Sequence, residues 1–278
     1  MTATCDFDVV VVGAGPVGLV AALLLAKQGI SVLLLEKERS IFPLPRAAHI
    51  DHEIMRIFQS IGVADDVSSS SEVSTRYEFL NVSGDVLMRF DTGRAAALSG
   101  WPPSNMIHQP SIEHVLRARV AECDSIDTRY GTAYRHHETC GEVVTVHFDT
   151  QGKASQACCR FLLGCDGANS AVRANSGLSL VDLGFSERWL VIDTKVIDSS
   201  RLPRHNLQIC DPERPTTSVR MGAGRHRWEF MLKAEEDEDR VSAPAFVANL
   251  LARWDVDGAV ELERTATYTF EARVASEW

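Results

Sequence analysis

Residues 8–36 have the sequence DVVVVGAGPVGLVAALLLAKQGISVLLLE, and the architecture of the chain follows from their pattern. Four consecutive valines at 9–12 are typical of a strand buried on both faces, because β-branched apolar residues suit that environment. Residues 19–27 are rich in alanine and leucine and predict a helix, which Gln28-Gly29 ends. Residues 31–35 predict a second apolar strand, so the stretch is expected to form a strand-helix-strand unit.

Three glycines occupy the first turn of this unit. Gly13 suits a tight exit from the strand, Gly15 lets backbone N–H groups approach a pyrophosphate, and Gly18 lets the helix pack closely on the strand. The helix N-terminus also offers free N–H groups and partial positive charge to phosphates. Glu36 follows Gly18 by eighteen residues, about where a ribose-binding carboxylate is expected. The pattern predicts a dinucleotide site, and the alternative is an ordinary strand-helix-strand unit with glycine at its turn.

Composition restricts the class of protein. The chain has 278 residues, of which 45% are hydrophobic and 24% charged, as in an ordinary soluble globular protein. Its formal net charge is −10 and it has no basic stripe, which disfavours a nucleic-acid partner. The apolar run of the first helix is too short to span a bilayer, and the N-terminus has no secretory pattern, so no membrane partner is expected.

The cysteines and histidines predict neither a disulfide framework nor a metal centre. The seven cysteines are odd in number and none has CxxC spacing, which indicates reduced thiols and a cytoplasmic protein. His136, His137, Glu138 and Cys140 lie close together in the sequence. No second group with the spacing of a metal site accompanies them, so we predict no bound metal.

The rest of the chain has helix patterns before residue 181 and mainly strand patterns after it. A loop ending in Pro45-Arg46-Ala47 precedes a helix over residues 51–61, for which Asp51 is a plausible N-cap. Residues 77–90 predict a hairpin, and a second helix begins at Gln109. Strand patterns dominate from Val181 onward. We therefore expect an α/β protein in which a Rossmann-like nucleotide-binding domain is interleaved with a mostly antiparallel β-sheet domain.

A further string, GCDGANSAVR at residues 164–173, follows an apolar strand. An Asp-Gly pair alone predicts only a turn. Together with VVGAGPVGL, PRAAHIDHEIMRIFQSIG, IHQPSIEHVLRARV and WEFML, in this order and spacing, the sequence resembles the class A flavin-dependent aromatic monooxygenases. This is the family of 4-hydroxybenzoate and phenol hydroxylases, and the similarity is greatest to its 3-(3-hydroxyphenyl)propionate hydroxylase group. The resemblance extends from Asp8 to the last residue.

The resemblance implies a p-hydroxybenzoate-hydroxylase-like fold that binds FAD. Residues 1–76 and 101–180 would form the FAD-binding domain, and residues 77–100 and 181–278 the substrate domain. By position in the family motifs, the implied cofactor-binding residues are Gly13, Ala14, Gly15, Pro16, Val17, Gly18, Glu36, Lys37, Arg46, Gln109, Asp166 and Gly167.

The implied activity is hydroxylation of a phenolic or other aromatic small molecule. In this family NAD(P)H, as co-substrate, reduces FAD, and O₂ then delivers one oxygen through a flavin C4a-hydroperoxide. The protein supplies orientation and a dry pocket. His49, Met221, Trp228 and Phe230 are candidate substrate contacts, with sheet core as the alternative for the last three. The residues identify no catalytic base.

The sequence departs from the family in one respect. The family carries another FAD signature, a Gly-Asp-Ala-Ala-His-like stretch, which is expected about a dozen residues beyond 269–273 and is not found in these 278 residues. The fold is therefore expected to be C-terminally truncated. The alternative functions are a non-catalytic nucleotide-binding fragment and half of a split flavoenzyme. The expected protein partners are a second copy of the chain, in a homodimer, or a complementing C-terminal piece. An NAD-linked dehydrogenase fits residues 1–36 but leaves the later motifs unexplained.

Overall fold

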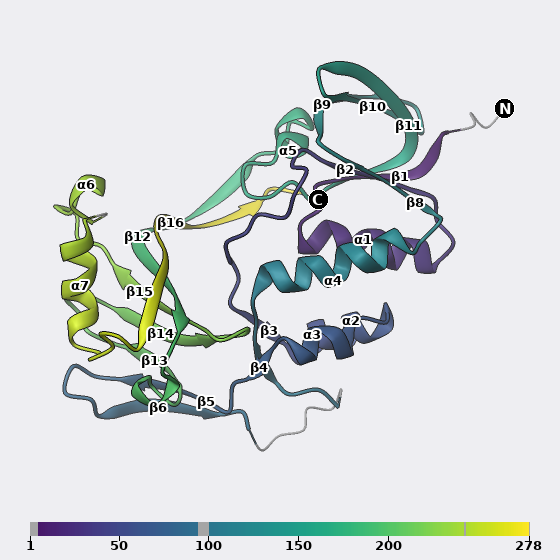
Figure 1. Ribbon diagram of the computed structural model, residues 1–278. Coiled ribbons are helices and arrows are strands. Elements are labelled where there is room, and N and C mark those ends of the chain that lie inside the picture. Colours follow the sequence, from purple (N-terminus) through teal and green to yellow (C-terminus); the bar gives the residue numbers. More distant parts are fainter. Residues whose placement is uncertain (1–4, 94–99, 242, 278) are drawn as a thin grey trace.

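The valine run of residues 9–12 lies at the centre of a six-stranded sheet, in the order β8-β2-β1-β11-β10-β9. The structure is a computed structural model that describes residues 5–93, 100–241 and 243–277 (Figure 1). The strands of this sheet are β1 (Phe7–Val12), β2 (Val32–Glu36), β8 (Ile126–Tyr130), β9 (Thr132–Cys140), β10 (Val143–Thr150) and β11 (Lys153–Gly164). The first four in spatial order pair in parallel, and β11, β10 and β9 pair antiparallel.

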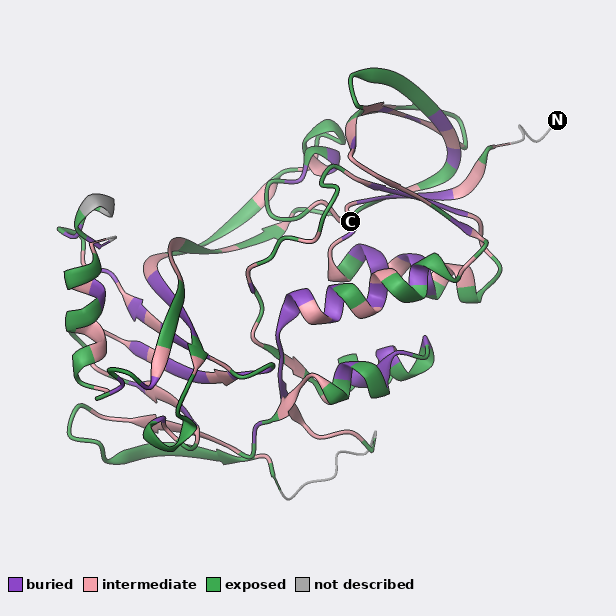
Figure 2. Ribbon diagram, viewed as in Figure 1, coloured by how far each residue is buried: buried purple, intermediate pink, exposed green. Residues whose placement is uncertain are grey.

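The predicted strand-helix-strand unit is confirmed as β1, α1 (Pro16–Lys27) and β2. Alternate β1 side chains serve two cores, because successive residues of a strand point to opposite faces. Val9 and Val11 pack with α1 and α4 (Gln109–Ala121), whereas Val10 and Val12 pack with Val146 of β10. Buried positions are accordingly concentrated in β1, β2, α1 and α4 (Figure 2).

Shorter elements complete this lobe. Helices α2 (His52–Ser60) and α3 (Ala64–Ser69) form a further layer beside α4, and α5 (Ala171–Asn175) follows β11 (Figure 1). The predicted capping role of Asp51 is confirmed, because its Oδ1 accepts from the Ile54 N–H at 2.9 Å. A small sheet in the order β3-β7-β4 leads toward the second lobe and comprises β3 (His49–Asp51), β4 (Glu72–Val73) and β7 (Ser104–Met106).

The second lobe is a seven-stranded sheet in the order β16-β12-β15-β14-β13-β5-β6. Its strands are β5 (Arg76–Leu80), β6 (Val86–Asp91), β12 (Leu180–Val196), β13 (Asn206–Ile209), β14 (Thr216–Met221), β15 (Arg225–Met231) and β16 (Val260–Ala275). The predicted hairpin at residues 77–90 is confirmed as β5–β6, and β5 joins the sheet by parallel pairing with β13.

One face of this sheet carries its own core beneath α7 (Pro244–Ala252). Trp228 and Phe230 of β15 and Ile192 of β12 pack there against Val247 of the helix. The one-turn elements α6 (Glu238–Val241) and η1 (Ser199–Arg201) border this lobe. Within the described residues, none of the helices has both the length and the apolar character needed to cross a membrane.

Candidate functional site

The carboxyl ends of three strands meet at one edge of the six-stranded sheet. Val12 of β1 is in register with Leu35 of β2 and Gly164 of β11. Gly13 N donates to Leu35 O at 2.7 Å, and Cys165 N donates to Val12 O at 2.8 Å. The glycine turn, the Glu36 carboxylate and the Asp-Gly turn after β11 are therefore neighbours. In open α/β sheets this edge is where ligands bind.

The structure gives a different reason for glycine at each of the three turn positions. Gly13 has φ +102°, and a Cβ there would lie 2.4 Å from the carbonyl oxygen of Cys165. A Cβ on Gly18 would lie 1.8 Å from the Gly13 oxygen, so helix and turn could not approach as they do. A Cβ on Gly15 would meet nothing within 4 Å. The fold thus requires glycine at 13 and 18, whereas at 15 glycine leaves open space beside the helix N-terminus.

The N-terminus of α1 is suited to an anion. Gly15 is the N-cap, Pro16 begins the helix, and the first turn has neither an acidic residue nor a side-chain cap. Val17 is 71% exposed, so the first turn faces outward. The partial positive charge of this helix end is therefore not compensated by a side chain of its own first turn.

Glu36 is held at the same edge by backbone donors. Its Oε2 accepts from Ala14 N at 2.7 Å and its Oε1 accepts from Glu38 N at 2.8 Å. The carboxylate thereby fixes the end of β2 against the glycine turn, and each oxygen retains a lone pair for a further donor. Lys37 is exposed beside it.

Asp166 caps the short helix that follows it. Its Oδ1 accepts from Ser170 Oγ at 2.5 Å, and its Oδ2 accepts from the N–H groups of Ala171 and Val172 at 2.7 and 3.1 Å. Gly167 has φ +87°, and a Cβ there would meet nothing within 4 Å. The Asp-Gly turn therefore combines a carboxylate committed to α5 with open space next to it.

Two residues predicted from separate motifs meet at the start of α4. Gln109 is buried, and its Oε1 accepts from Ala47 N at 2.8 Å, which fixes the loop that carries Arg46. Its Nε2 donates to Glu113 Oε1 at 2.6 Å. The Arg46 guanidinium lies 3.8 Å from the same Glu113 oxygen and is 57% exposed. Sequence reasoning missed Glu113, although its spacing of four from Gln109 on a helix was an available signal.

The loop is also held from the second lobe. Arg227 of β15 donates to the carbonyl oxygens of Arg46 at 2.7 Å and Pro45 at 2.9 Å. The same guanidinium pairs with Asp193 of β12, and both side chains are buried. Burial and the nearby Asp193 carboxylate raise the pKa of Glu229, whereas Arg227 opposes that shift. No local sequence signal identified this cluster.

The predicted substrate contacts occupy different places. Trp228 and Phe230 are buried beneath α7, as the sheet-core alternative describes. Met221 is also buried, and its strand neighbour Val219 is in register with Arg227, so Met221 belongs to the opposite face. His49 is exposed in β3, where partial burial lowers its pKa and the Asp51 carboxylate opposes the shift. The structure does not bring these four residues together.

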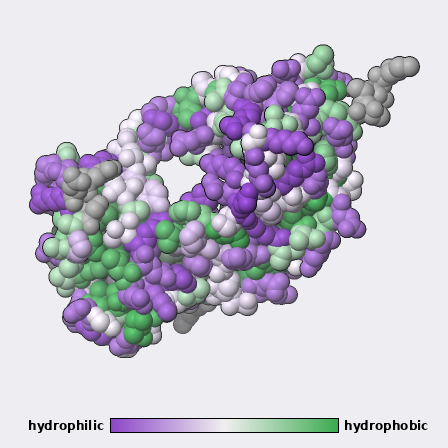
Figure 3. Space-filling model, turned by 45° about the horizontal axis from the view of Figure 1, so that its top comes forward, coloured by the Kyte–Doolittle hydropathy of each residue, from purple (hydrophilic) through white to green (hydrophobic). Residues whose placement is uncertain are grey.

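That opposite face of the sheet is polar. Glu229 is in register with Thr217, which pairs with Gln208, and Thr217 Oγ1 donates to Gln208 Oε1 at 2.7 Å. Burial, followed by the Glu229 carboxylate, raises the pKa of Tyr77 to about 12, so this phenol stays protonated. An opening between the lobes is visible in the space-filling view (Figure 3). α1 and α4 both begin on the side that faces the second lobe (Figure 1).

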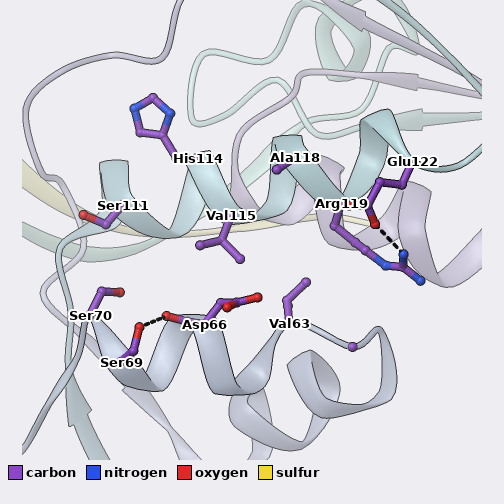
Figure 4. Close-up of a pocket in the computed structure, with 11 residues that line it drawn as sticks. Val63, Asp66, Ser69, Ser70, Ser111, His114, Val115, Ala118, Arg119 and Glu122 are labelled. Carbon is purple, nitrogen blue, oxygen red and sulfur yellow. Dashed lines mark hydrogen bonds and ion pairs between the residues drawn. The ribbon is translucent and has the colours of Figure 1, made fainter.

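A separate cavity of about 560 Å³ lies between α3 and α4. Asp66 and Val63 line it from one side, and Val115 and Ala118 from the other (Figure 4). None of the predicted cofactor-binding residues lines this cavity. It is therefore not part of the site at the strand ends.

Related proteins show sequence similarity over nearly the whole chain. A probable NADH-specific resorcinol 4-hydroxylase from Rhodococcus jostii is 36% identical over 277 residues, which are 98% of this chain and 51% of that protein. A 3-(3-hydroxy-phenyl)propionate/3-hydroxycinnamic acid hydroxylase from Mycobacterium sp. is 33% identical over 97% of this chain and 47% of that protein. The chain thus spans about half the length of these relatives.

Solved structures share the fold. The p-nitrophenol 4-monooxygenase from Pseudomonas putida superposes with a TM-score of 0.87 at 22% identity, over 97% of this chain and 69% of that one. Aklavinone-11 hydroxylase, in a ternary complex with FAD and aklavinone, gives 0.84 at 23% identity over 99% of this chain and 55% of that one. The expected α/β fold with interleaved sheets is therefore confirmed.

The family described as FAD binding domain matches residues 6–278, which is nearly all of the chain. The match includes the glycine turn, the loop with Arg46, the start of α4 and the Asp-Gly turn, whose geometry is given above. The chain belongs to this FAD binding domain family.

Proposed function

We propose that this chain is the flavin-binding part of an FAD-dependent, NAD(P)H-using monooxygenase that hydroxylates a phenolic substrate. The observation that carries the proposal is the meeting of the glycine turn, Glu36 and the Asp-Gly turn at one sheet edge, in a chain of the FAD binding domain family. The relatives named as resorcinol and hydroxyphenylpropionate hydroxylases support the aromatic substrate class. The NADH-specific relative supports a nicotinamide co-substrate.

The residues present fit FAD. The open space at Gly15 and the uncompensated start of α1 suit the pyrophosphate, and we propose that Glu36 accepts from the adenosine ribose. Arg46, exposed and fixed through its backbone, offers a guanidinium fork to phosphate oxygens. Gly167 leaves room for the cofactor beside Asp166. We propose the same role for the remaining predicted cofactor contacts, which are Gly13, Ala14, Pro16, Val17, Gly18, Lys37 and Gln109.

FAD, when bound, accepts electrons from NAD(P)H and activates O₂, which no side chain of the protein can do. The role of the chain is to bind and orient the cofactor and the substrate. Tyr77, protonated because its pKa is raised to about 12, can donate a hydrogen bond to a phenolic oxygen. We propose that the polar face with Tyr77 contacts the substrate, that His49 and Met221 lie at its margin, and that Trp228 and Phe230 support it from behind.

We also propose which parts of the chain bind the cofactor and which bind the substrate. Residues 1–76 and 101–180 would hold the cofactor, and residues 77–100 and 181–278 the substrate, although residues 94–99 lie outside the described part of the chain. Phe161 of the central strand β11 is 60% exposed and Leu163 is 37% exposed. We infer that another segment or a second copy covers them. Seven cysteines without a disulfide suit a cytoplasmic location.

The decisive experiment is the visible spectrum of the purified 278-residue chain before and after addition of FAD. Flavin absorption that remains with the protein through gel filtration supports the proposal. NADH or NADPH oxidation stimulated by resorcinol or 3-(3-hydroxyphenyl)propionate is then expected when the C-terminal half of a relative is added. A colourless protein that is folded by circular dichroism and takes up no FAD would contradict it. That result would favour a non-catalytic nucleotide-binding fragment, and binding of NADH without flavin would favour a dehydrogenase.

A further inference from the structure

A cluster of three potential metal ligands lies on the hairpin formed by β9 and β10. His136 of β9 is directly in register with His147 of β10, and Glu138 follows His136 by two residues. Because side chains alternate along a strand, His136, Glu138 and His147 share one face of the hairpin. The two imidazole rings are stacked, with centroids 4.3 Å apart and an interplanar angle of 9°.

The donor atoms of these side chains lie near one another. One ligand atom from each residue lies within 4.8 Å of the other two, and His136 Nε2 is 3.9 Å from Glu138 Oε1. His147 Nε2 is buried and has no hydrogen-bond partner among the described residues. Buried polar atoms normally have a partner, and this nitrogen is available to bind one.

Only two of the three residues lie near each other in the sequence. His136 and Glu138 are adjacent in the sequence to His137, which points to the other face and lies with its Nδ1 2.7 Å from Tyr134 Oη. His147 comes from the next strand, and the register shifts between His147 and Phe148. The third ligand therefore depends on strand pairing, which spacing along the chain does not reveal.

We propose that His136, Glu138 and His147 bind one Zn²⁺ ion, with the fourth position taken by water. Two imidazoles and one carboxylate are a known type of Zn²⁺ ligand set with an open position, and imidazole nitrogen suits this metal. The ligand atoms must approach one another to reach bonds of about 2.0–2.2 Å. His136 and Glu138 are exposed, so their side chains can rotate out of the present stacked arrangement without disturbing a core.

The bound ion would connect two strands of the sheet. β9 is an edge strand of the six-stranded sheet, and the ion joins it to β10. An edge strand has unpaired backbone groups on one side, and a cross-strand metal bridge restrains its opening. None of the three ligands is among the predicted cofactor-binding residues, and the proposed ion takes no part in the proposed FAD chemistry.

The test is isothermal titration of the chelator-treated full chain with Zn²⁺. We expect one ion per chain, and at least roughly tenfold weaker binding in His136→Gln, Glu138→Gln and His147→Gln, because even outer-shell changes cost that much. His137→Gln is the matched control, on the same strand but the opposite face, and should bind as the wild type does. Equal affinity in the wild type and in the His136→Gln/His147→Gln double variant overturns the proposal.

A second measurement separates this site from the thiols. Cys140 is exposed and follows Glu138 by two residues, so a thiolate is the competing ligand. Co²⁺ bound by the three proposed ligands should lack the thiolate charge-transfer absorption, and Cys140→Ser should leave its visible bands unchanged. A charge-transfer band that disappears in Cys140→Ser overturns the assignment. Zn²⁺ should also raise the melting temperature of the wild type and of His137→Gln, but not of His147→Gln, provided circular dichroism shows that all three are folded.

Discussion

The guanidinium of Arg227 donates to both carboxylate oxygens of Asp193, with Nε–Oδ1 at 2.6 Å and Nη2–Oδ2 at 3.2 Å. These side chains are 5% and 1% exposed. The remaining donors of Arg227 bind the backbone carbonyls of Pro45 and Arg46, which belong to the other lobe. A buried ion pair in the β-sheet lobe therefore fixes the loop that carries the proposed phosphate-binding arginine.

Arg227→Met should lower the free energy of unfolding by about 2–3 kcal/mol, because the buried Asp193 carboxylate loses its hydrogen bonds to Arg227 and keeps only the Arg264 guanidinium, 3.2 Å away. Freed from its anchor, the loop should also position Arg46 less well, so FAD affinity should fall in any variant fraction that folds. Urea denaturation followed by tryptophan fluorescence measures the first effect, and flavin fluorescence quenching the second.

The control for this variant lies on the same strand. Arg225 pairs with Glu263 at 2.8 Å, and both side chains are about a quarter exposed. Arg225→Met should cost about 1 kcal/mol or less, because solvent weakens such a pair. Similar losses of unfolding free energy in both variants would show that the buried Arg227 contacts stabilise the fold no more than the partly exposed pair does.

The turn glycines allow the requirements of folding and of binding to be separated. Gly15→Ala meets no atom within 4 Å, and with φ −75° its backbone accommodates alanine. Stability should therefore fall by no more than the cost of a poorer N-cap, about 1 kcal/mol, while FAD affinity falls. Gly18→Ala would place a Cβ 1.8 Å from the Gly13 oxygen and should cost about 3 kcal/mol even without cofactor. Thermal unfolding and FAD titration of both variants check this. Unchanged FAD affinity in Gly15→Ala would contradict the proposed pyrophosphate site.

The sequence alone predicts those elements and site residues whose positions depend on a few neighbouring residues or on the pairing of adjacent strands. The valine run, the glycine turn and the helix after it predicted β1, α1 and β2, because hydrophobic period and turn chemistry act over a few residues. Glu36 and Asp166 were predicted as ligands. Their positions at one sheet edge follow from the parallel pairing of β1 with β2 and β11.

Contacts between distant segments were beyond such reasoning. Arg227 binds carbonyl groups 181 and 182 residues earlier in the sequence, and a backbone acceptor leaves no residue-type signal. Trp228 and Phe230 are candidate substrate contacts because they are apolar, but packing alone determines which face of the strand meets α7. The hydrogen bonds that engage Asp166 with α5 likewise depend on the local backbone path rather than on the Asp-Gly pair itself.

His226 should make the protein less stable in acid. Burial lowers its pKa from 6.5 to about 3 in the folded chain, so between these values the unfolded state binds more protons and stability falls as pH falls. Relative to His226→Gln, the wild type should lose about 1.4 kcal/mol between about pH 7.5 and about pH 5.5. Urea denaturation at both pH values measures this. The comparison cancels Glu229, whose raised pKa acts in the opposite direction and which both proteins contain. A difference that is independent of pH would show that His226 is not neutral and buried.

Asp166 and Ser170 can be used to distinguish a cofactor ligand from a helix cap. Ser170 Oγ accepts from Arg173 N at 3.0 Å and donates to Asp166, so Ser170→Ala and Asp166→Ala should each destabilise α5 and lower the free energy of unfolding by about 1–2 kcal/mol. Only Asp166→Ala should also weaken FAD binding by more than this loss explains, because only its carboxylate adjoins the open space at Gly167. FAD dissociation constants and unfolding free energies of both variants test the difference. If both variants lower FAD affinity equally, Asp166 acts on the cofactor only through the helix that it caps.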